Sequence, residues 1–482
     1  MSLDPAVRSL LQPARPIVVL RWLGQLSLVL WGLLLVPALL AWVDGEGALA
    51  WALSVYGVLP AAALSGFAWL PTRWGSLRVN EALAVTVLIF VIAAALMIMP
   101  MTTAGLAPLD ACFEAVSGVT TTGLSMLTDP ADQPVALLFT RAWMQWFGGL
   151  GIVVLSLTLA FGRSGDLRRL ADPVGEETTP DSSIRLHARR LLWVYLVLTG
   201  VGLALVSAAG MPWPMAPIHV LAAVSTGGFG GFDDSLAGVG RGAQAALLAV
   251  AAAGALPLPL YYRAWLHGPR QLLRDPELRA LLGAVAIVAL LLWWLGALMP
   301  ADALLQAATA QTTTGFASVD IGALPADAKL VLVVSMATGA GLGSTGGGIK
   351  LLRVLILIRV VQVTLLRAQL PPHGVAAPRI GGRSLDPPQI EHALAVALLF
   401  PALILACWMP FVVAGYAPLD GLFEVVSAAA TVGLSTGITS PELAPHLKGV
   451  LTLAMLAGRV EVVALLVLLY PRTWLPRSVA RG

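Results

Sequence analysis

Long apolar stretches separated by short polar segments run along almost the entire chain. Ten of them are about 20 residues long or more, the length at which an α-helix crosses the ~30 Å hydrocarbon core of a bilayer. The pattern predicts an all-α, polytopic membrane protein. The ten stretches cover residues 17–43, 48–70, 81–100, 136–161, 189–209, 243–262, 279–298, 328–366 (interrupted by glycines), 391–415 and 447–470.

The composition agrees with this pattern and excludes several classes of protein. The chain has 482 residues, of which 58% are hydrophobic and only 11% charged, whereas soluble domains carry about 25% charged residues. Cys112 and Cys407 are the only cysteines and both lie in apolar context, so neither a disulfide framework nor a zinc cluster is expected. The six histidines lack the spacing of metal ligands.

The basic residues are distributed asymmetrically along the chain. If the N-terminus is cytoplasmic, all but five of the 29 basic residues fall on the cytoplasmic side, including those of the loop 163–190. This is the positive-inside rule, and it predicts that both termini are cytoplasmic. The first apolar stretch has no small-residue cleavage site after it and reads as a signal anchor. The basic charge is therefore a topology signal, and the expected partner is the lipid bilayer and no nucleic acid.

Four segments on the predicted outer side resemble one another. They read "PLDACFEAVSGVTTTGLS" (108–125), "PMAPIHVLAAVSTGGFGG" (214–231), "PADALLQAATAQTTTGFAS" (300–318) and "PLDGLFEVVSAAATVGLS" (418–435). A proline precedes a glycine by 15 residues in three of them and by 14 in the second. Turns that only connect helices do not keep such a register, so the pattern indicates an internal repeat.

Each repeat reads as a span, a short re-entrant helix, a Thr/Gly segment and a second span. Irregular backbone at membrane depth survives only inside protein or against a watery cavity, and four such units around an axis would create that cavity. The carboxyl ends of the short helices favour a cation, and the segments that follow offer backbone carbonyls in place of a hydration shell. We define units 1 to 4 as residues 79–165, 186–270, 276–368 and 388–482, after an N-terminal two-helix region at 1–78.

The Thr/Gly segments are residues 120–123, 225–228, 312–315 and 430–433. The candidate ion-binding residues within them are Thr120, Thr121, Thr122, Gly123, Thr226, Gly227, Gly228, Thr313, Thr314, Gly315, Thr431, Val432 and Gly433.

With these segments in view, the chain resembles the Trk/Ktr/HKT superfamily of potassium transporters over nearly its whole length. Further matches are "QWFGGLGIVVLSL" (145–157), "TTTGFASVD" (312–320) and "MLAGRVEVVALLVLL" (455–469). The two additional N-terminal spans resemble the bacterial TrkH type, while the fourth segment is closer in sequence to the KtrB type. In this superfamily a glycine at the key position of all four repeats goes with potassium. The second and fourth segments depart from Thr-Thr-Thr-Gly. These departures concern the exact ion selectivity and not the presence of the site, because backbone carbonyls do most of the coordinating.

The resemblance implies a potassium uptake protein of the bacterial inner membrane, with four pseudo-symmetric membrane–pore-loop–membrane repeats and K⁺ as the transported ion. It also implies a homodimer with a pore in each subunit and a cytosolic nucleotide-binding regulatory subunit of the TrkA type. No organic cofactor is expected, and no nucleophile–base set indicates an enzyme. Two alternatives stay open. One is a cation-coupled secondary transporter (K⁺/H⁺ or K⁺/Na⁺ symport), although the four units are parallel rather than inverted. The other is a less selective monovalent-cation channel.

The eighth apolar stretch contains six glycines between residues 339 and 348, which we call the glycine loop. The helix before it is long enough for only about half the bilayer, so the loop falls near mid-membrane, where it is able to plug the pore. "GSTGGGIK" lacks the Gly-Lys-Ser/Thr order of a phosphate-binding P-loop. The predicted gate residues are Gly343, Ser344, Thr345, Gly346, Gly347 and Lys350, together with Arg459 of the last span.

Arg459 lies near the middle of the last apolar stretch, where a charge costs about 2.5–3.5 kcal/mol on insertion scales. We expect it to contact carbonyls of the glycine loop. The resemblance implies that its counterpart in the superfamily sits opposite the intramembrane loop as part of the gate, and a purely structural anchor between helices is the alternative. Asp110 and Glu114, and likewise Asp420 and Glu424, stand four residues apart on the first and fourth short helices. The favoured role is structural, with the Glu reaching backbone amides behind the Thr/Gly segment, and the alternative is attraction of cations.

Overall fold

The computed structural model describes residues 12–71, 77–163, 180–371 and 377–475. It is an all-α bundle, as predicted, and the one strand pairing in the described residues is a two-residue hairpin, β1 (Arg379–Ile380) with β2 (Arg383–Ser384). Residues 1–11 and most of the loop 163–190, on which the predicted orientation partly depends, lie outside the described residues.

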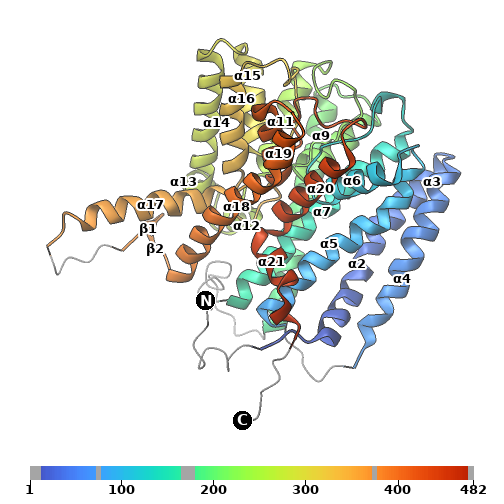
Figure 1. Cartoon of the computed structure of the whole chain (residues 1–482), viewed down its shortest axis with the longest axis horizontal. Helices are drawn as coiled ribbons and strands as arrows, with labels where there is room; N and C mark the ends of the chain where they lie inside the picture. The colour runs from blue at the N-terminus through green and yellow to red at the C-terminus, as the bar shows by residue number, and fades with distance from the viewer. Residues whose placement is uncertain (1–11, 72–76, 164–179, 372–376, 476–482) are drawn as a thin grey trace.

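The N-terminal region forms two long antiparallel segments at one edge of the bundle (Figure 1). The second segment passes through a π-helical turn, and its residue Gly57 lies against the side chain of Leu34. The helices of this region are α2 (Pro16–Val43), α3 (Gly47–Ala52), η1 (Leu53–Val58), α4 (Leu59–Ser65) and η2 (Gly66–Trp69).

Each of the four units has a long first helix, a short helix and a second helix. The first helices are α5 (Val79–Thr102), α9 (Pro180–Ala208), α14 (Pro276–Trp294) and α18 (Pro387–Val413). The short helices are α6 (Pro108–Val119), α10 (Met215–Val224), α15 (Pro300–Gln311) and α19 (Pro418–Ala429). The second helices are α7 (Val135–Arg163), α11 (Arg241–Gly254) with α12 (Leu258–His267), α16 (Ala326–Thr338) with α17 (Leu351–Arg367), and α20 (Pro445–Val460) with α21 (Val462–Leu469).

The short helices have 10 to 12 residues, as expected for re-entrant helices. In α6, α15 and α19 a proline occupies the first turn, where its missing N–H and fixed φ cost nothing, and an aspartate two residues later complements the helix dipole. Most residues of α6, α10 and α19 are buried. These helices therefore lie inside the bundle, surrounded by the long ones.

Three of the four second helices are broken, where the sequence indicated one break. Between α11 and α12 the chain bends by 87°, because Pro257 cannot continue the helix and disfavours helical backbone before it. Between α20 and α21 it bends by 105° at Glu461, which adopts φ +66° while its carboxylate contacts Arg353 at 2.6 Å and His392 at 3.2 Å. The expected continuous spans 243–262 and 447–470 are therefore bent.

Helix α17 follows the glycine loop and projects sideways from the bundle (Figure 1). Small helices complete the described chain: η3 (Pro130–Asp132), α13 (Arg270–Arg274) and η4 (Pro471–Thr473).

Apolar surface distinguishes this bundle from a soluble protein. Six described helices are long and apolar enough to cross a membrane, or eight when each bent pair counts as one span. The predicted spans at α7 and at the interrupted pair α16/α17 are not among these. Exposed tryptophans gather near helix ends, where the interface between lipid and water favours them, and they include Trp42, Trp69, Trp265 and Trp294.

Candidate functional site

The four Thr/Gly segments share one backbone conformation. In each, the residue just before the key glycine donates its N–H to a carbonyl five residues earlier, as Thr122 does to Ser117 at 2.9 Å and Val432 to Ser427 at 2.8 Å. The threonine two residues before the glycine has a left-handed φ in all four segments, between +50° and +57°. Such values are uncommon for a β-branched residue and mark a backbone held by its surroundings. The four threonines are Thr121, Thr226, Thr313 and Thr431.

The four key glycines close a ring. An added Cβ at Gly123 would lie 2.2 Å from the carbonyl oxygen of Gly227, in the next segment. An added Cβ at Gly228 would lie 2.1 Å from Thr314 O, and one at Gly315 would lie 1.9 Å from Val432 O. An added Cβ at Gly433 would lie 2.3 Å from Thr122 O of the first segment.

Each segment therefore contacts the next in chain order, and the fourth contacts the first. All four glycines have φ between +78° and +94°. The site thus demands glycine for two reasons, the left-handed backbone and the adjacent carbonyl.

The hydroxyl groups of the segments divide into two sets. Thr120 donates to the Val116 carbonyl at 2.7 Å and lies 2.8 Å from the Thr122 hydroxyl, so these two are satisfied locally, and Thr312 and Thr314 repeat the arrangement. The buried hydroxyls of Thr121 and Thr431 have no hydrogen-bond partner among the residues that the structure describes.

The equivalent hydroxyls of units 2 and 3 contact the glycine loop. Thr226 lies 3.2 Å from the Thr345 hydroxyl, and Thr313 accepts the Gly347 N–H at 2.8 Å. An added Cβ at Gly347 would lie 2.1 Å from the Ala430 carbonyl oxygen of unit 4. The loop is therefore packed against three of the four segments at the threonine end, and a side chain at position 347 would not fit.

Arg459 joins the glycine loop to the remaining unit. Its guanidinium donates to the Thr345 carbonyl at 2.6 Å and to the Gly148 carbonyl of α7 at 3.0 Å, and the side chain is buried. The contact with a loop carbonyl, predicted from the sequence, is present. The contact with unit 1 was not anticipated, because nothing in the sequence places α7 beside α20.

Two side chains outside the glycine loop also hold its backbone. Glu277, in the first turn of α14, accepts the N–H of Leu342 at 2.6 Å. Lys350, which has φ +80°, donates its ammonium group to the Gly346 carbonyl. Ser344 donates to Gly341 O at 2.6 Å, within the loop. The loop is thus an ordered element with its polar groups largely paired.

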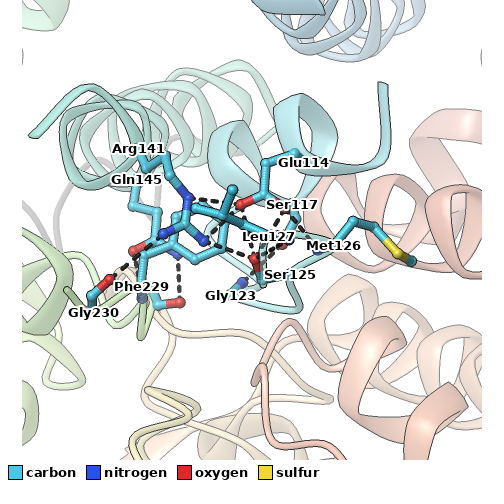
Figure 2. Close-up of polar contacts among 11 residues, drawn as sticks. Glu114, Ser117, Gly123, Ser125, Met126, Leu127, Arg141, Gln145, Phe229 and Gly230 are labelled. Carbon is cyan, nitrogen blue, oxygen red and sulfur yellow. Dashed lines mark hydrogen bonds and ion pairs between the residues drawn. The ribbon is translucent and has the colours of Figure 1, made fainter. Parts of the chain in front are cut away.

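Behind the segments of units 1 and 4, glutamates hold the chain that follows. Glu114 accepts the Met126 N–H at 2.9 Å, and Glu424 accepts the Thr436 N–H at 2.7 Å. These are backbone contacts of the kind expected from the sequence. Glu114 also pairs with buried Arg141 of α7 at 2.6 Å, and that guanidinium lies 4.1 Å from the ring centre of Phe229 in unit 2 (Figure 2).

Ion pairs between neighbouring units form a further feature, which the sequence interpretation missed. Each joins the start of a second helix to the aspartate of the next short helix: Arg241 with Asp302 at 2.6 Å, Lys329 with Asp420 at 2.8 Å, and Lys448 with Asp110. The signal was a basic residue 13 to 15 positions after the key glycine, present in units 2, 3 and 4. Hydrogen bonds from Arg241 hold the pKa of the Asp302 carboxyl below its usual value.

The junction between units 1 and 2 lacks this pair, because Met215 stands 13 residues before Gly228. A cavity of about 400 Å³ lies there instead, lined among others by Ser125, Asp129, Arg141 and Asp233. In the part of the chain that the structure describes, no three His, Cys, Asp or Glu side chains come together as a metal site.

Comparison with known proteins agrees with this architecture. Residues 55–474 match the model of the family described as "TrkH: Cation transport protein". Similar relatives include the "Trk system potassium uptake protein TrkH" of Salmonella typhimurium, 29% identical and covering 95% of this chain and 99% of that one. The TrkH of Halomonas elongata is 30% identical over the same shares, and the TrkI of that organism is 30% identical over 95% of this chain and 96% of the relative.

Among solved structures, the potassium transporter TrkH from Vibrio parahaemolyticus superposes with a TM-score of 0.83 at 25% identity. The match covers 96% of this chain and all of that one. The ring of four segments, the all-α membrane fold and the family match over most of the chain lead to one conclusion: this chain belongs to the TrkH family of cation transport proteins.

Proposed function

We propose that this protein takes up potassium through a pore whose selectivity filter is the ring of four Thr/Gly segments. The closed ring of glycine–carbonyl contacts is the observation that carries the proposal. It brings the backbone carbonyls of all four units to one place, where they are able to replace the hydration shell of a K⁺ ion. The carboxyl ends of four short helices point at the same place, and their dipoles favour a cation there. The named activities of the relatives, potassium uptake and potassium transport, support the choice of ion.

The unpartnered hydroxyls of Thr121 and Thr431 extend this site toward the glycine loop. They are buried oxygen ligands with free lone pairs, so they suit an ion leaving the carbonyl layers. Their counterparts, Thr226 and Thr313, are occupied by the loop.

The glycine loop is the gate in this proposal. Its contacts with the segments of units 2, 3 and 4 support a position across the end of the ring, and Arg459 ties it to unit 1 through Gly148. Opening requires the loop to leave Thr226 and Thr313, and the Arg459 contacts oppose that movement. The Thr345 carbonyl is costly to release from the buried guanidinium, because an unpaired buried polar group pays a desolvation penalty.

The proposal includes a setting in the bacterial inner membrane with both termini cytoplasmic, which the distribution of basic residues supports. It also includes a homodimer and a cytosolic nucleotide-binding regulatory subunit, in keeping with the relatives' description as parts of a Trk system. Cysteine substitutions at Ala237 and at Gln271 test the orientation. A membrane-impermeant maleimide applied to spheroplasts should label the first and spare the second, and the reverse pattern would invert the topology.

Cation flux into liposomes tests the function. Purified protein is reconstituted with K⁺ or Na⁺ as the only permeant cation, with and without an imposed H⁺ gradient. Potassium flux well above sodium flux, independent of the H⁺ gradient, is the expected result. Equal fluxes would refute a selective filter, and flux that requires the H⁺ gradient would favour the symport mechanism.

A further inference from the structure

The second Thr/Gly segment is built differently from the others. Gly227 stands before the key glycine, where the other segments have Thr122, Thr314 and Val432. With two successive glycines this segment has the largest conformational freedom of the four. It therefore needs more support from its surroundings to present its carbonyls in a fixed position.

The supports that hold segments 1 and 4 are missing from unit 2. Ser117 and Ser427, six residues before the key glycines, accept the N–H of Gly123 and Gly433 at 3.1 Å. Unit 2 has Ala222 at that position. The glutamate nine residues before the glycine is replaced by His219, whose buried Nε2 has no hydrogen-bond partner in the described part of the chain.

Gln145, on α7 of unit 1, supplies the missing support. Its amide Nε2 donates to the Gly227 carbonyl at 2.5 Å, and its Oε1 accepts the Phe229 N–H at 3.0 Å. The side chain is fully buried. Figure 2 shows it beside Arg141 on the same helix, directed toward Phe229 and Gly230. One side chain thus fixes the backbone on both sides of the key glycine, Gly228.

Gln145 also explains why position 227 is glycine. An added Cβ at Gly227 would lie 2.5 Å from Cδ and 2.6 Å from Oε1 of Gln145. The amide group therefore occupies the volume that a threonine or valine side chain takes in the other segments. Gly227 and Gln145 form a complementary pair, in which one residue gives up its side chain and the other fills the space.

We propose that Gln145 is a positioning residue that determines specificity, because it fixes the Gly227 carbonyl within the ring of four segments. That carbonyl is the atom that faces Gly123 at the junction between units 1 and 2. Among the described residues, this junction has no pair like Lys448 and Asp110 to hold the two units together. Gln145, through its hydrogen bonds to Gly227 and Phe229, links unit 1 to unit 2 instead. The inference rests on the proposed function of the Thr/Gly segments as a selectivity filter.

The test compares K⁺ and Na⁺ flux in liposomes for wild type and variants. Gln145→Leu removes both hydrogen bonds at similar volume, and Gln145→Glu keeps the acceptor for Phe229 but loses the donor to Gly227. We expect each to lower the K⁺/Na⁺ flux ratio by about tenfold, the equivalent of about 1.4 kcal/mol of discrimination. Ser27→Ala is the control, because this buried side chain holds a backbone carbonyl, Leu23 O at 2.8 Å, in α2 of the N-terminal region, outside the four units. Its flux ratio should equal that of wild type.

A second pair of variants tests the exchange of volume. Gly227→Thr alone should collapse the flux ratio, because its side chain collides with Gln145. The double variant Gly227→Thr, Gln145→Ala restores both the space and the Thr-Thr-Gly pattern of the other segments, and should recover most of the ratio. This comparison decides the matter even if Gln145→Leu fails to fold.

The outcomes separate this inference from the function on which it rests. A wild-type protein that does not discriminate K⁺ from Na⁺ would refute the proposed filter itself. A selective wild type with folded Gln145 variants of about wild-type ratio would overturn the role of Gln145 alone. A double variant no better than Gly227→Thr would overturn the exchange of volume between positions 145 and 227.

Discussion

Replacing Gly315 by serine is the sharpest test of the ring. Gly315 has φ +80°, which costs a residue with a side chain about 1–2 kcal/mol. Its added Cβ would lie 1.9 Å from the Val432 carbonyl oxygen and 2.9 Å from the carbonyl carbon. A carbon and a carbonyl oxygen normally approach to about 3.3 Å. The two segments must therefore separate by more than 1 Å for the serine to fit.

That separation exceeds the tolerance of a binding site, which is about 0.5 Å. The carbonyls of units 3 and 4 would no longer close around a dehydrated K⁺, while smaller, better hydrated Na⁺ would lose less. We expect Gly315→Ser to lower the K⁺/Na⁺ flux ratio in liposomes by at least about tenfold, which corresponds to about 1.4 kcal/mol. Single-cation flux measured at equal protein content gives the ratio directly.

Gly296→Ser is the matched control. Gly296 has φ +68° but no atom within 4 Å of an added Cβ. The Gly296→Ser variant has the same cost of a left-handed φ but no collision of the added Cβ with a carbonyl. Its melting temperature should therefore fall while its K⁺/Na⁺ flux ratio stays at the wild-type value. A folded Gly315→Ser protein with wild-type selectivity would refute the view that these glycines exist to admit the neighbouring carbonyl.

Three further predictions concern the gate and the junctions. Arg459→Gln removes the guanidinium contacts with Thr345 and Gly148, and should raise K⁺ leak severalfold in liposomes without a regulator; unchanged leak would leave Arg459 a structural anchor. Deleting residues 343–346 shortens the glycine loop and should also raise leak, and a conductance equal to wild type would remove the loop as a gate. Asp110→Asn leaves buried Lys448 without its carboxylate partner, with only the Pro441 carbonyl to accept from it, and should destabilise the protein by about 3–5 kcal/mol in thermal melts in detergent. The double variant Asp110→Asn, Lys448→Met should recover part of that loss, and strictly additive effects would show that the pair is not coupled.

Much of the fold was accessible from the sequence because membrane proteins obey strong one-dimensional constraints. A spanning helix must be apolar over about 20 residues, and basic residues mark the cytoplasmic side. The fourfold register from Pro108 to Gly123 and its counterparts identified the Thr/Gly segments. It did so because each segment has to reach the same axis from an equivalent helix. The glycine loop was found in the same way, since six glycines cannot form a stable helix in lipid.

The breaks in the second helices were less accessible. Pro257 gave a signal for the bend after α11, but a proline is compatible with either a kink or a full break in a membrane helix. The bend at Glu461 had no local signal, because its cause is the contact of the carboxylate with Arg353 and His392, which belong to other helices.

By itself, then, the sequence determined the number and kind of units, the candidate ion-binding residues and the loop below them, because these follow from patterns along one chain. Only the tertiary structure decided what holds each unit to the next. Gln145 lies 82 residues from Gly227, and Lys448 lies 338 residues from Asp110. A hydrogen bond or an ion pair depends on distances of about 3 Å in space, and no local pattern of residues records which helices pack side by side.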